Sequence, residues 1–556
     1  MLSEEKTMYK CPNCAGNLTF DIALQQLHCT YCDTRVDPYS YYKEKDAEET
    51  QCLPGEYEAT VFTCPQCGAA LISEDTTAAT FCSFCGASAI LDSRVSRERR
   101  PGSIIPFTRT KEDCRAAYGK LLRRALFAPK ELKDEALIEK FRGIYMPYWV
   151  YSLEKKERIM FPGRNTYRRG DYLITEHYQM DCRVDAEYSG LAYDASSSFS
   201  DSLSTAIAPF DLKEKKEFTP SFLSGFYADT SDVKEDVYLP EAEEFVIKDT
   251  CGTLAKDPVC RTYGAGRGET EYALKNAMRP SGSTAELALL PVWFLSYRNG
   301  SRVSYAVVNG QTGKAAADLP VDKKRYLAGS LILAIPLFFL LNLYFTFTPR
   351  KILLIAALLA LLCTAVSNHQ ITNILARESG EDDMGLSSKR QELERPLPEW
   401  AVKKRGQSPV SPFGKALMTT ILFYGIILLL VHTLEGKGEG ILRLVLFFLP
   451  VLLFTGSSLM IHARGSLFPG SGNRKKPFLG GHFKEKRTTL IKPLAGILSA
   501  VVILVLNPVS DWFYYTGAFV CMGTVLWAII DIINQHNLLA TRKLPQLGKR
   551  GGDEAG

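Results

Sequence analysis

The pattern of hydrophobic and polar positions divides the chain into two unlike halves. Up to Arg325, apolar residues come in short runs between charged ones, and none of these runs could span a bilayer. Beyond Arg325, long apolar runs dominate the remainder of the 556 residues. The pattern therefore predicts a water-facing N-terminal half and a helical, membrane-embedded C-terminal half.

Six apolar segments in the second half are candidate transmembrane helices. They lie at 326–348, 352–367, 416–434, 444–461, 494–510 and 513–533. A spanning helix needs about 20 apolar residues, with about 17 near the lower limit. The second and fifth segments are short, so whether they cross fully stays open. The sequence predicts an all-α transmembrane domain of about six helices at 326–536, followed by a tail at 537–556.

Basic residues alternate between the connectors of these segments and predict their orientation. Lys323, Lys324 and Arg325 precede the first segment, and the connectors 368–415 and 462–493 each contain eight Lys or Arg residues. The three intervening links contain two, two and none. The positive-inside rule then places both termini and both long connectors in the cytoplasm. No charged residue occupies the centre of a segment, which argues against an ion pathway.

The stretch between the apolar half and the N-terminal cysteines predicts an α+β, β-rich domain at 101–322. A helical period begins after Thr110 and stops at Pro129. Alternating aromatic and polar residues follow and predict strands, and Asn309-Gly310 predicts a hairpin turn. The basic stretch 94–100 is interpreted as a linker and the serine-rich stretch 194–206 as a mobile loop.

The strongest chemical signal is a repeated set of four cysteines. Each set has the spacing C-x2-C, fourteen residues, C-x2-C, and the second set lies 53 residues after the first. Four thiolates at this spacing form the tetrahedron that Zn²⁺ prefers, so the sequence predicts two zinc ions. The predicted ligands are Cys11, Cys14, Cys29, Cys32, Cys64, Cys67, Cys82 and Cys85.

The alternatives to zinc are disulfides or unrelated thiols. The N-terminus has no apolar segment typical of a secretory signal, which favours a reducing compartment and metal-bound thiols. Cys52 has no partner at ligand spacing, and His28 stands beside a set that is already complete. We therefore expect a zinc ribbon at 1–38, a linker at 39–60 and a second ribbon at 61–92.

Charge separates the ribbons from the remainder of the chain. Residues 1–90 contain five Lys or Arg and thirteen Asp or Glu, whereas the formal charge of the whole chain is +5. Nucleic-acid binding requires several cations against the phosphates, so acidic ribbons disfavour it. A protein partner that docks on the ribbons fits this charge better.

Catalytic motifs are absent from the sequence. It has no GxxxxGK[ST] phosphate loop, no HExxH and no GxSxG, and His177 is the one histidine between residues 90 and 325. The leading hypothesis is a non-enzymatic scaffold that recruits a protein to the membrane. The alternatives are a transporter or channel with regulatory ribbons, and a membrane-tethered nucleic-acid binder.

The chain resembles a family of bacterial multi-pass membrane proteins with transcription-factor-IIB-type zinc ribbons, whose members are often labelled as relatives of the primosomal helicase. The resemblance rests on CPNC…CTYC, IIPF…LLRRALFAPKEL…IEKFRGIYMPYWVY, FTPSFLSGFYAD, LLPVWFLSY…VNGQTGK and the tail ATRKLPQLGKRGG. It implies zinc ribbons and a location in the bacterial cytoplasmic membrane. It implies no activity, and the missing phosphate loop excludes the helicase label here.

Overall fold

The protein forms two compact units. The computed structural model describes residues 9–40, 55–73, 82–87, 92–263, 275–344, 348–379, 383–393 and 495–543. The first unit contains Met1–Pro320, Ala376–Arg395 and Leu539–Gly556. The second contains Val321–Leu375 and Pro396–Leu538. The predicted spans 416–434 and 444–461 lie outside the described residues.

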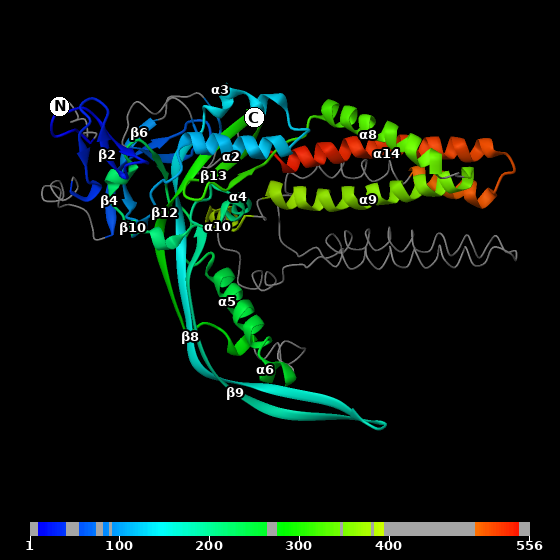
Figure 1. The fold of residues 1–556 in the computed structure, drawn as a ribbon, viewed down its shortest axis with the longest axis horizontal. Coiled ribbons are helices and arrows are strands. Elements are labelled where there is room, and N and C mark those ends of the chain that lie inside the picture. The colour runs from blue at the N-terminus through cyan, green and yellow to red at the C-terminus, as the bar shows by residue number, and fades with distance from the viewer. Residues whose placement is uncertain are drawn as a thin grey trace. The chain divides into compact units, whose positions relative to one another are not determined.

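A large mixed sheet forms the centre of the first unit, which confirms the predicted β-rich domain (Figure 1). Among the described residues it has twelve strands: the order β10-β7-β12-β8-β11-β5-β4-β6, with β9 on β8, β13 on β12, and β14 and β15 on β13. Their bounds are β4 Glu56–Thr63, β5 Ala70–Ser73, β6 Asp92–Arg99, β7 Ser103–Ile104, β8 Arg142–Arg169, β9 Tyr172–Asp194, β10 Lys216–Glu217, β11 Tyr227–Asp229, β12 Gly282–Asn299, β13 Arg302–Asn309, β14 Ala315–Ala317 and β15 Arg542–Lys543.

The two strands that carry similar Pro-x-Trp sequences pair with each other at the middle of this sheet. Strands β8 and β12 are antiparallel, with Pro147 opposite Leu289 and Pro291 opposite Tyr145. Residues 143–151 of β8 are all buried, because both faces of the sheet are covered. The indole of Trp149 donates to the carbonyl of Val233, so the buried ring keeps its hydrogen bond.

Beyond the sheet, β8 and β9 continue as a long two-stranded arm that ends in a turn at Gly170 (Figure 1). Helices α5 (Leu239–Leu254) and α6 (Pro258–Thr262) pack against its middle part. There Ile159, Phe161 and Val184 form a small core with Cys251 and Cys260. Two paired strands alone are marginally stable in water, so this helical cover supports the arm.

The remaining helices of the first unit are short. They are α2 Lys111–Arg124, η2 Lys130–Lys133, α3 Glu135–Ile138, α4 Asp201–Ile207, η3 Leu212–Glu214, η4 Pro220–Leu223 and α10 Met384–Leu393. Helix α2 begins where the sequence predicts, because Thr110 and Asp113 form a capping box. It ends five residues before Pro129, since Ala125 leaves the helical region with a ψ of 76°.

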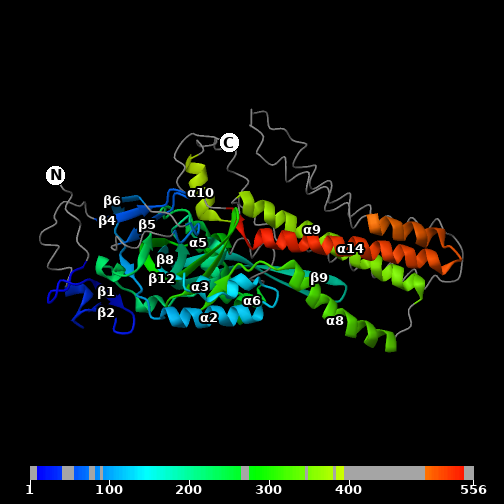
Figure 2. The ribbon, with the colours of Figure 1, turned by 90° about the horizontal axis from the view of Figure 1, so that it is seen from above.

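Three local interpretations of the sequence are wrong. The basic stretch 94–100 is no linker, because Asp92–Arg99 is strand β6 and pairs with β4 along its whole length (Figure 2). The turn between β13 and β14 is longer than the two residues Asn309-Gly310, since the backbone NH of Asn309 donates to the carbonyl of Lys314. The serine-rich stretch is largely buried at 194–200 and then forms helix α4.

The second unit is helical where the structure describes it. Its helices are α8 Lys323–Tyr344, α9 Pro349–Ser379, Ala495–Leu506 and α14 Asp511–Leu539. Within this unit, Leu353 and Ala356 of α9 pack against Ala500, Ala518 and Cys521. Among the helices searched in the described residues, α14 is the one long and apolar enough to cross a membrane. Six spans therefore stay a prediction.

A buried carboxylate explains why the serine-rich stretch is ordered. Asp229, at the end of β11, accepts hydrogen bonds from the hydroxyls of Ser196 and Ser198, the former at 2.5 Å. The next serine, Ser197, donates to Asp232 through both its backbone NH and its hydroxyl. Burial raises the pKa of Asp229 to about 7, although the serine hydrogen bonds oppose this shift. The serines thus satisfy a carboxylate that the fold buries.

Replacing Asp229 with Asn should remove part of the pH dependence of stability. Because the folded-state pKa lies above the usual 3.8, the folded protein holds a proton that the unfolded chain loses first. This stability is present at low pH and is lost as pH rises through about 7. Between pH 5 and 8, wild type should lose about 3 kcal/mol more unfolding free energy than Asp229→Asn does. Denaturant unfolding measures this, and Asp236→Asn, at an exposed site, should behave like wild type.

Candidate metal centres

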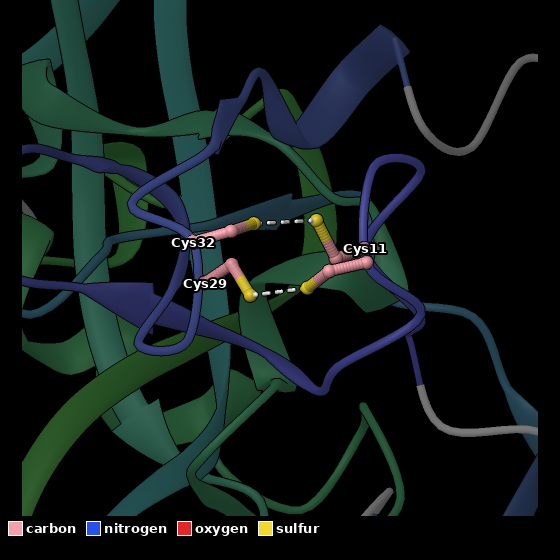
Figure 3. A group of neighbouring side chains, drawn as sticks. Cys11, Cys29 and Cys32 are labelled. Carbon is pink, nitrogen blue, oxygen red and sulfur yellow. Dashed lines mark hydrogen bonds between the residues drawn. The ribbon is translucent and has the colours of Figure 1, made fainter.

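Both cysteine sets of the N-terminal region come together in space. In the first set, β1 Leu18–Asp21, β2 Gln26–Cys29 and β3 Arg35–Val36 form a separate three-stranded sheet. This sheet holds the Cys11–Cys14 turn opposite the Cys29–Cys32 turn (Figure 3). In the second set, β4 and β5 of the large sheet flank the Cys64–Cys67 turn, and the sulfurs of this turn meet those of Cys82 and Cys85.

Four turns with one shared geometry present the eight thiols. In each turn the backbone NH of the first cysteine donates to the carbonyl five residues on, at 2.7–2.9 Å. The NH four residues on donates back to the carbonyl of that cysteine, at 2.8–3.0 Å. In every turn, the residue four positions after the first cysteine has a positive φ. These residues are Ala15, Asp33, Gly68 and Gly86. The repeat in sequence is therefore a repeat in backbone conformation.

The sulfur separations suit a tetrahedral metal ion. The four Sγ atoms of each set lie within 4.8 Å of one another. Cys11 lies 3.4 Å from Cys32 and Cys14 lies 3.4 Å from Cys29, sulfur to sulfur. The matching pairs of the second set are 3.7 Å apart. A tetrahedron with Zn–S bonds of about 2.3 Å has edges of about 3.8 Å, so both sets could hold zinc.

The charge states of the thiols also favour a cation. In the second set, hydrogen bonds from Cys67 and Cys82 lower the pKa of Cys85 to about 2. The pKa of Cys67, in turn, is raised by its hydrogen bonds with Cys82 and Cys85 and by burial. One thiolate is therefore stabilised at the expense of its neighbours. Full deprotonation of four adjacent thiols needs a dication, which is what a tetrathiolate zinc site supplies.

The two sets differ in their surroundings. All four cysteines of the second set are buried, whereas Cys14 and Cys32 of the first set are exposed. The ring of Phe84, in a turn of the second set, packs on Phe294 of β12 with 5.4 Å between centroids. In the other turn, Gln66 accepts a hydrogen bond from Arg298 of β12. The second set thus belongs to the core of the large sheet.

The other cysteines and the histidine next to the first set take structural positions. His28 pairs with Asp33 at 2.6 Å. Cys114 is a buried residue of α2, and Cys251 and Cys260 belong to the core under the β8–β9 arm. Cys52 lies outside the described residues. Among the residues described, only the two cysteine sets bring three or more Cys, His, Asp or Glu ligand atoms within 4.8 Å.

Comparison with known proteins gives one similarity to report. The chain is 29% identical over 340 residues to the uncharacterised protein YdjG of Bacillus subtilis (strain 168), which covers 59% of this chain and 96% of that protein. No protein-family model matches the chain. No solved structure matches it either. Because the name of the relative assigns no activity, the function must be argued from the site.

Only two of the four positive-φ positions in these turns are glycines, and the other two carry side chains. Ala15 and Asp33 both have a φ of 57°. The regular cysteine spacing could have indicated the positive φ of both residues, because the residue four positions after the first cysteine is equivalent in all four turns. Gly16 is needed for another reason: a Cβ there would lie 2.7 Å from the ring of Tyr31 and 3.2 Å from the sulfur of Cys14.

The difference in burial predicts two rates of zinc release. Zinc in the first set should pass to a chelator quickly, because Cys14 and Cys32 face solvent. Release of zinc from the second set requires local unfolding of the core, because all four of its cysteines are buried. We expect this release to be slower by at least about tenfold, since metal binding contributes a large free energy to folding. A chromogenic chelator would resolve two phases of one zinc each.

Matched serine variants assign the phases. Cys14→Ser should remove the fast phase and destabilise the large sheet less than loss of the second site does, because the first ribbon packs at its edge of the common core. Cys67→Ser should remove the slow phase and destabilise that sheet by several kcal/mol, as loss of a structural zinc site does. A single phase in wild type, or equal destabilisation by both variants, would contradict the assignment.

Proposed function

We propose that the protein is a zinc-dependent scaffold anchored in the cytoplasmic membrane, whose first ribbon docks a protein partner. The observation that carries the proposal is a contrast between the two cysteine sets: one is buried in the core, whereas the other displays its metal-binding turns to solvent. Burial of the second set can be explained by a role in stability alone. The exposed set has a free surface, and that surface is what a partner could contact.

The exposed faces of the helices in the second unit support a membrane anchor. Leu331, Ile332 and Leu333 of α8 are 61–73% exposed, and Phe519 of α14 is 81% exposed. A run of large apolar side chains facing outward is unfavourable in water and favourable against lipid. Helix α14, with 29 residues, is about 44 Å long, which exceeds the hydrocarbon thickness of about 30 Å. Helix α9 contains the second predicted span, 352–367, and α8 covers residues 326–344 of the first.

The ends of α14 support an orientation. Trp512, Phe513 and Tyr515 are exposed at its beginning, as is typical of the aromatic belt at a membrane surface. Arg542 and Lys543 follow its end, where the chain re-enters the first unit. Helix α8 likewise begins with Lys323 and Lys324. Because the basic ends connect to the first unit, the positive-inside rule favours a cytoplasmic first unit.

The first ribbon offers the docking surface. Tyr31, next to Cys32, is 80% exposed, although aromatic residues are often enriched in interfaces rather than left in water. The tetrathiolate zinc centre would add about two negative charges close to this ring. We infer a partner that covers the turns of the first ribbon with a basic or hydrogen-bond-donating surface. The partner itself, transport and nucleic-acid binding stay untested predictions.

Labelling from outside intact cells tests the anchor. A cysteine placed at Ser510, just before α14, should react with a membrane-impermeant maleimide above the background of wild type, which keeps all its zinc ligands. A cysteine at Ser40, after the first ribbon, should react only once the cells are permeabilised. Reaction of Ser40→Cys in intact cells would contradict the proposed orientation, and extraction of the protein by carbonate would contradict the anchor.

Site-specific photo-crosslinking tests the docking surface. A photoreactive phenylalanine analogue in place of Tyr31 should give one defined crosslinked protein in cells, because this ring lies in the proposed contact. The matched control is the same analogue in place of Tyr172, which is 77% exposed at the tip of the β8–β9 arm. Adding Cys14→Ser should reduce the Tyr31 crosslink by at least about tenfold, since the turn then loses its metal.

The outcomes separate docking from the anchor. If Tyr31 and Tyr172 capture the same proteins, or if Cys14→Ser leaves the Tyr31 crosslink unchanged, the first ribbon is no docking surface. The labelling experiment would still decide the membrane orientation independently.

A further inference from the structure

Three carboxylates meet inside the first unit, away from the metal centres. Asp194 ends strand β9, Asp201 begins helix α4, and Asp383 directly precedes helix α10. Asp194 and Asp383 are each 3% exposed. The Oδ2 atom of Asp194 is buried and has no hydrogen-bond partner among the residues that the structure describes. A buried carboxylate oxygen without a partner is unfavourable if it carries charge, so this atom requires a ligand.

Helix α10 docks on the first unit through the same carboxylates. Asp201 accepts a hydrogen bond from the backbone NH of Met384 at 2.8 Å. The hydroxyl of Tyr238 donates to the other oxygen of Asp201 at 2.6 Å and accepts from the NH of Gly385 at 3.0 Å. A Cβ at Gly385 would lie 3.1 Å from that hydroxyl, so the helix begins in close contact. The start of α10 is therefore held by Asp201, one of the two carboxylates whose charges act on Asp194.

The shape of the cluster favours a proton over a metal ion. Within the described part of the chain, three or more metal-ligand atoms come within 4.8 Å of one another only in the two cysteine sets. Both oxygens of Asp201 already accept hydrogen bonds. One oxygen of Asp383 accepts from the NH of Leu386 at 2.8 Å. A proton, unlike a metal ion, does not require several ligand atoms, and it neutralises the carboxylate of Asp194.

We propose that the Asp194–Asp201–Asp383 cluster is a proton-binding site, and that a proton on Asp194 holds helix α10 on the first unit. The inference concerns the first unit alone and does not depend on the proposed membrane scaffold. Its consequence is that the segment after α9 is docked at low pH and released at high pH.

The groups that face Asp194 determine the direction of this pH dependence. Burial raises the pKa of Asp194 well above its usual range, and the charges of Asp201 and Asp383 raise it further. Ser204 of α4 opposes the shift by a hydrogen bond, while Tyr148 of β8 and Tyr238 face the cluster as neutral phenols. Glu241 of α5 adds another acid near Asp201. Arg542 donates to Ser202 of α4 at 3.4 Å.

Release of α10 removes Asp383 and admits water, so the pKa of Asp194 falls back toward its usual range. The docked state therefore holds a proton that the released state loses at lower pH. Docking stability is full at low pH and declines as pH rises, by about tenfold in the docking equilibrium for each pH unit between the two pKa values.

Hydrogen exchange on the detergent-solubilised full chain tests the site. Amides of 384–393 should lose at least about tenfold protection between pH 5 and pH 9, after correction for the intrinsic rate, because the corresponding docking loss is one decade per pH unit. Asp194→Asn, which is neutral at every pH, should keep its protection within about twofold over the same range. Asp185→Asn, an exposed position on the same strand, is the matched control and should follow wild type.

A second variant protects the test against misfolding. Asp383→Asn removes a charge from the α10 side without changing β9, and its side-chain oxygen still accepts from Leu386. It should weaken the pH dependence, but less than Asp194→Asn does, because burial and the charge of Asp201 still raise the pKa of Asp194. Equal pH dependence in wild type and in a folded Asp194→Asn or Asp383→Asn variant would overturn the proposal, as would pH-independent protection in wild type.

Discussion

Four sulfur atoms buried in an apolar core create the charge problem around which the first unit is arranged. Thiolates cannot be buried side by side without a cation, and four neutral thiols would fill the same space without fixing its geometry. The second cysteine set lies between β4–β5 and the central strands β12 and β13. Tyr305 of β13 is fully buried beside these thiols, and burial raises its pKa. Strand β13 also pairs with β15, which follows α14. One centre thus joins distant parts of the chain.

The same cysteine spacing serves a different purpose at the first set. Its three-stranded sheet is separate from the large sheet, although Leu18, Phe20 and Leu27 pack into a common core with Phe222. That core covers one side of the ribbon, and Cys14, Tyr31 and Cys32 stay in solvent on the other. Identical coordination chemistry therefore yields a structural centre where the surroundings bury it and an accessible one where they do not.

The first unit also buries the carboxylates of Asp229 and Asp194, and their surroundings differ. Asp229 is satisfied by serine hydroxyls from the stretch that precedes α4. Asp194, a few residues before those serines, has an oxygen that accepts no hydrogen bond from the described part of the chain. The difference follows from what faces each carboxylate: hydroxyl donors in the first case, and further carboxylates and α10 in the second. Hydroxyls make Asp229 part of the framework, whereas Asp194 depends on a proton.

The sequence alone determined the features that depend on local spacing. The cysteine repeat predicted both thiol sets, because a two-residue gap fixes the turn that presents two sulfurs. The capping residues at Thr110 predicted the start of α2. Hydrophobic length identified the helices of the second unit, while the six-span count goes beyond the helices described. Tertiary structure alone decided which thiol set is buried, that 94–100 is a strand, and that Asp194, Asp201 and Asp383 meet. These depend on contacts between residues far apart in the chain, and no local pattern encodes which segment will cover another.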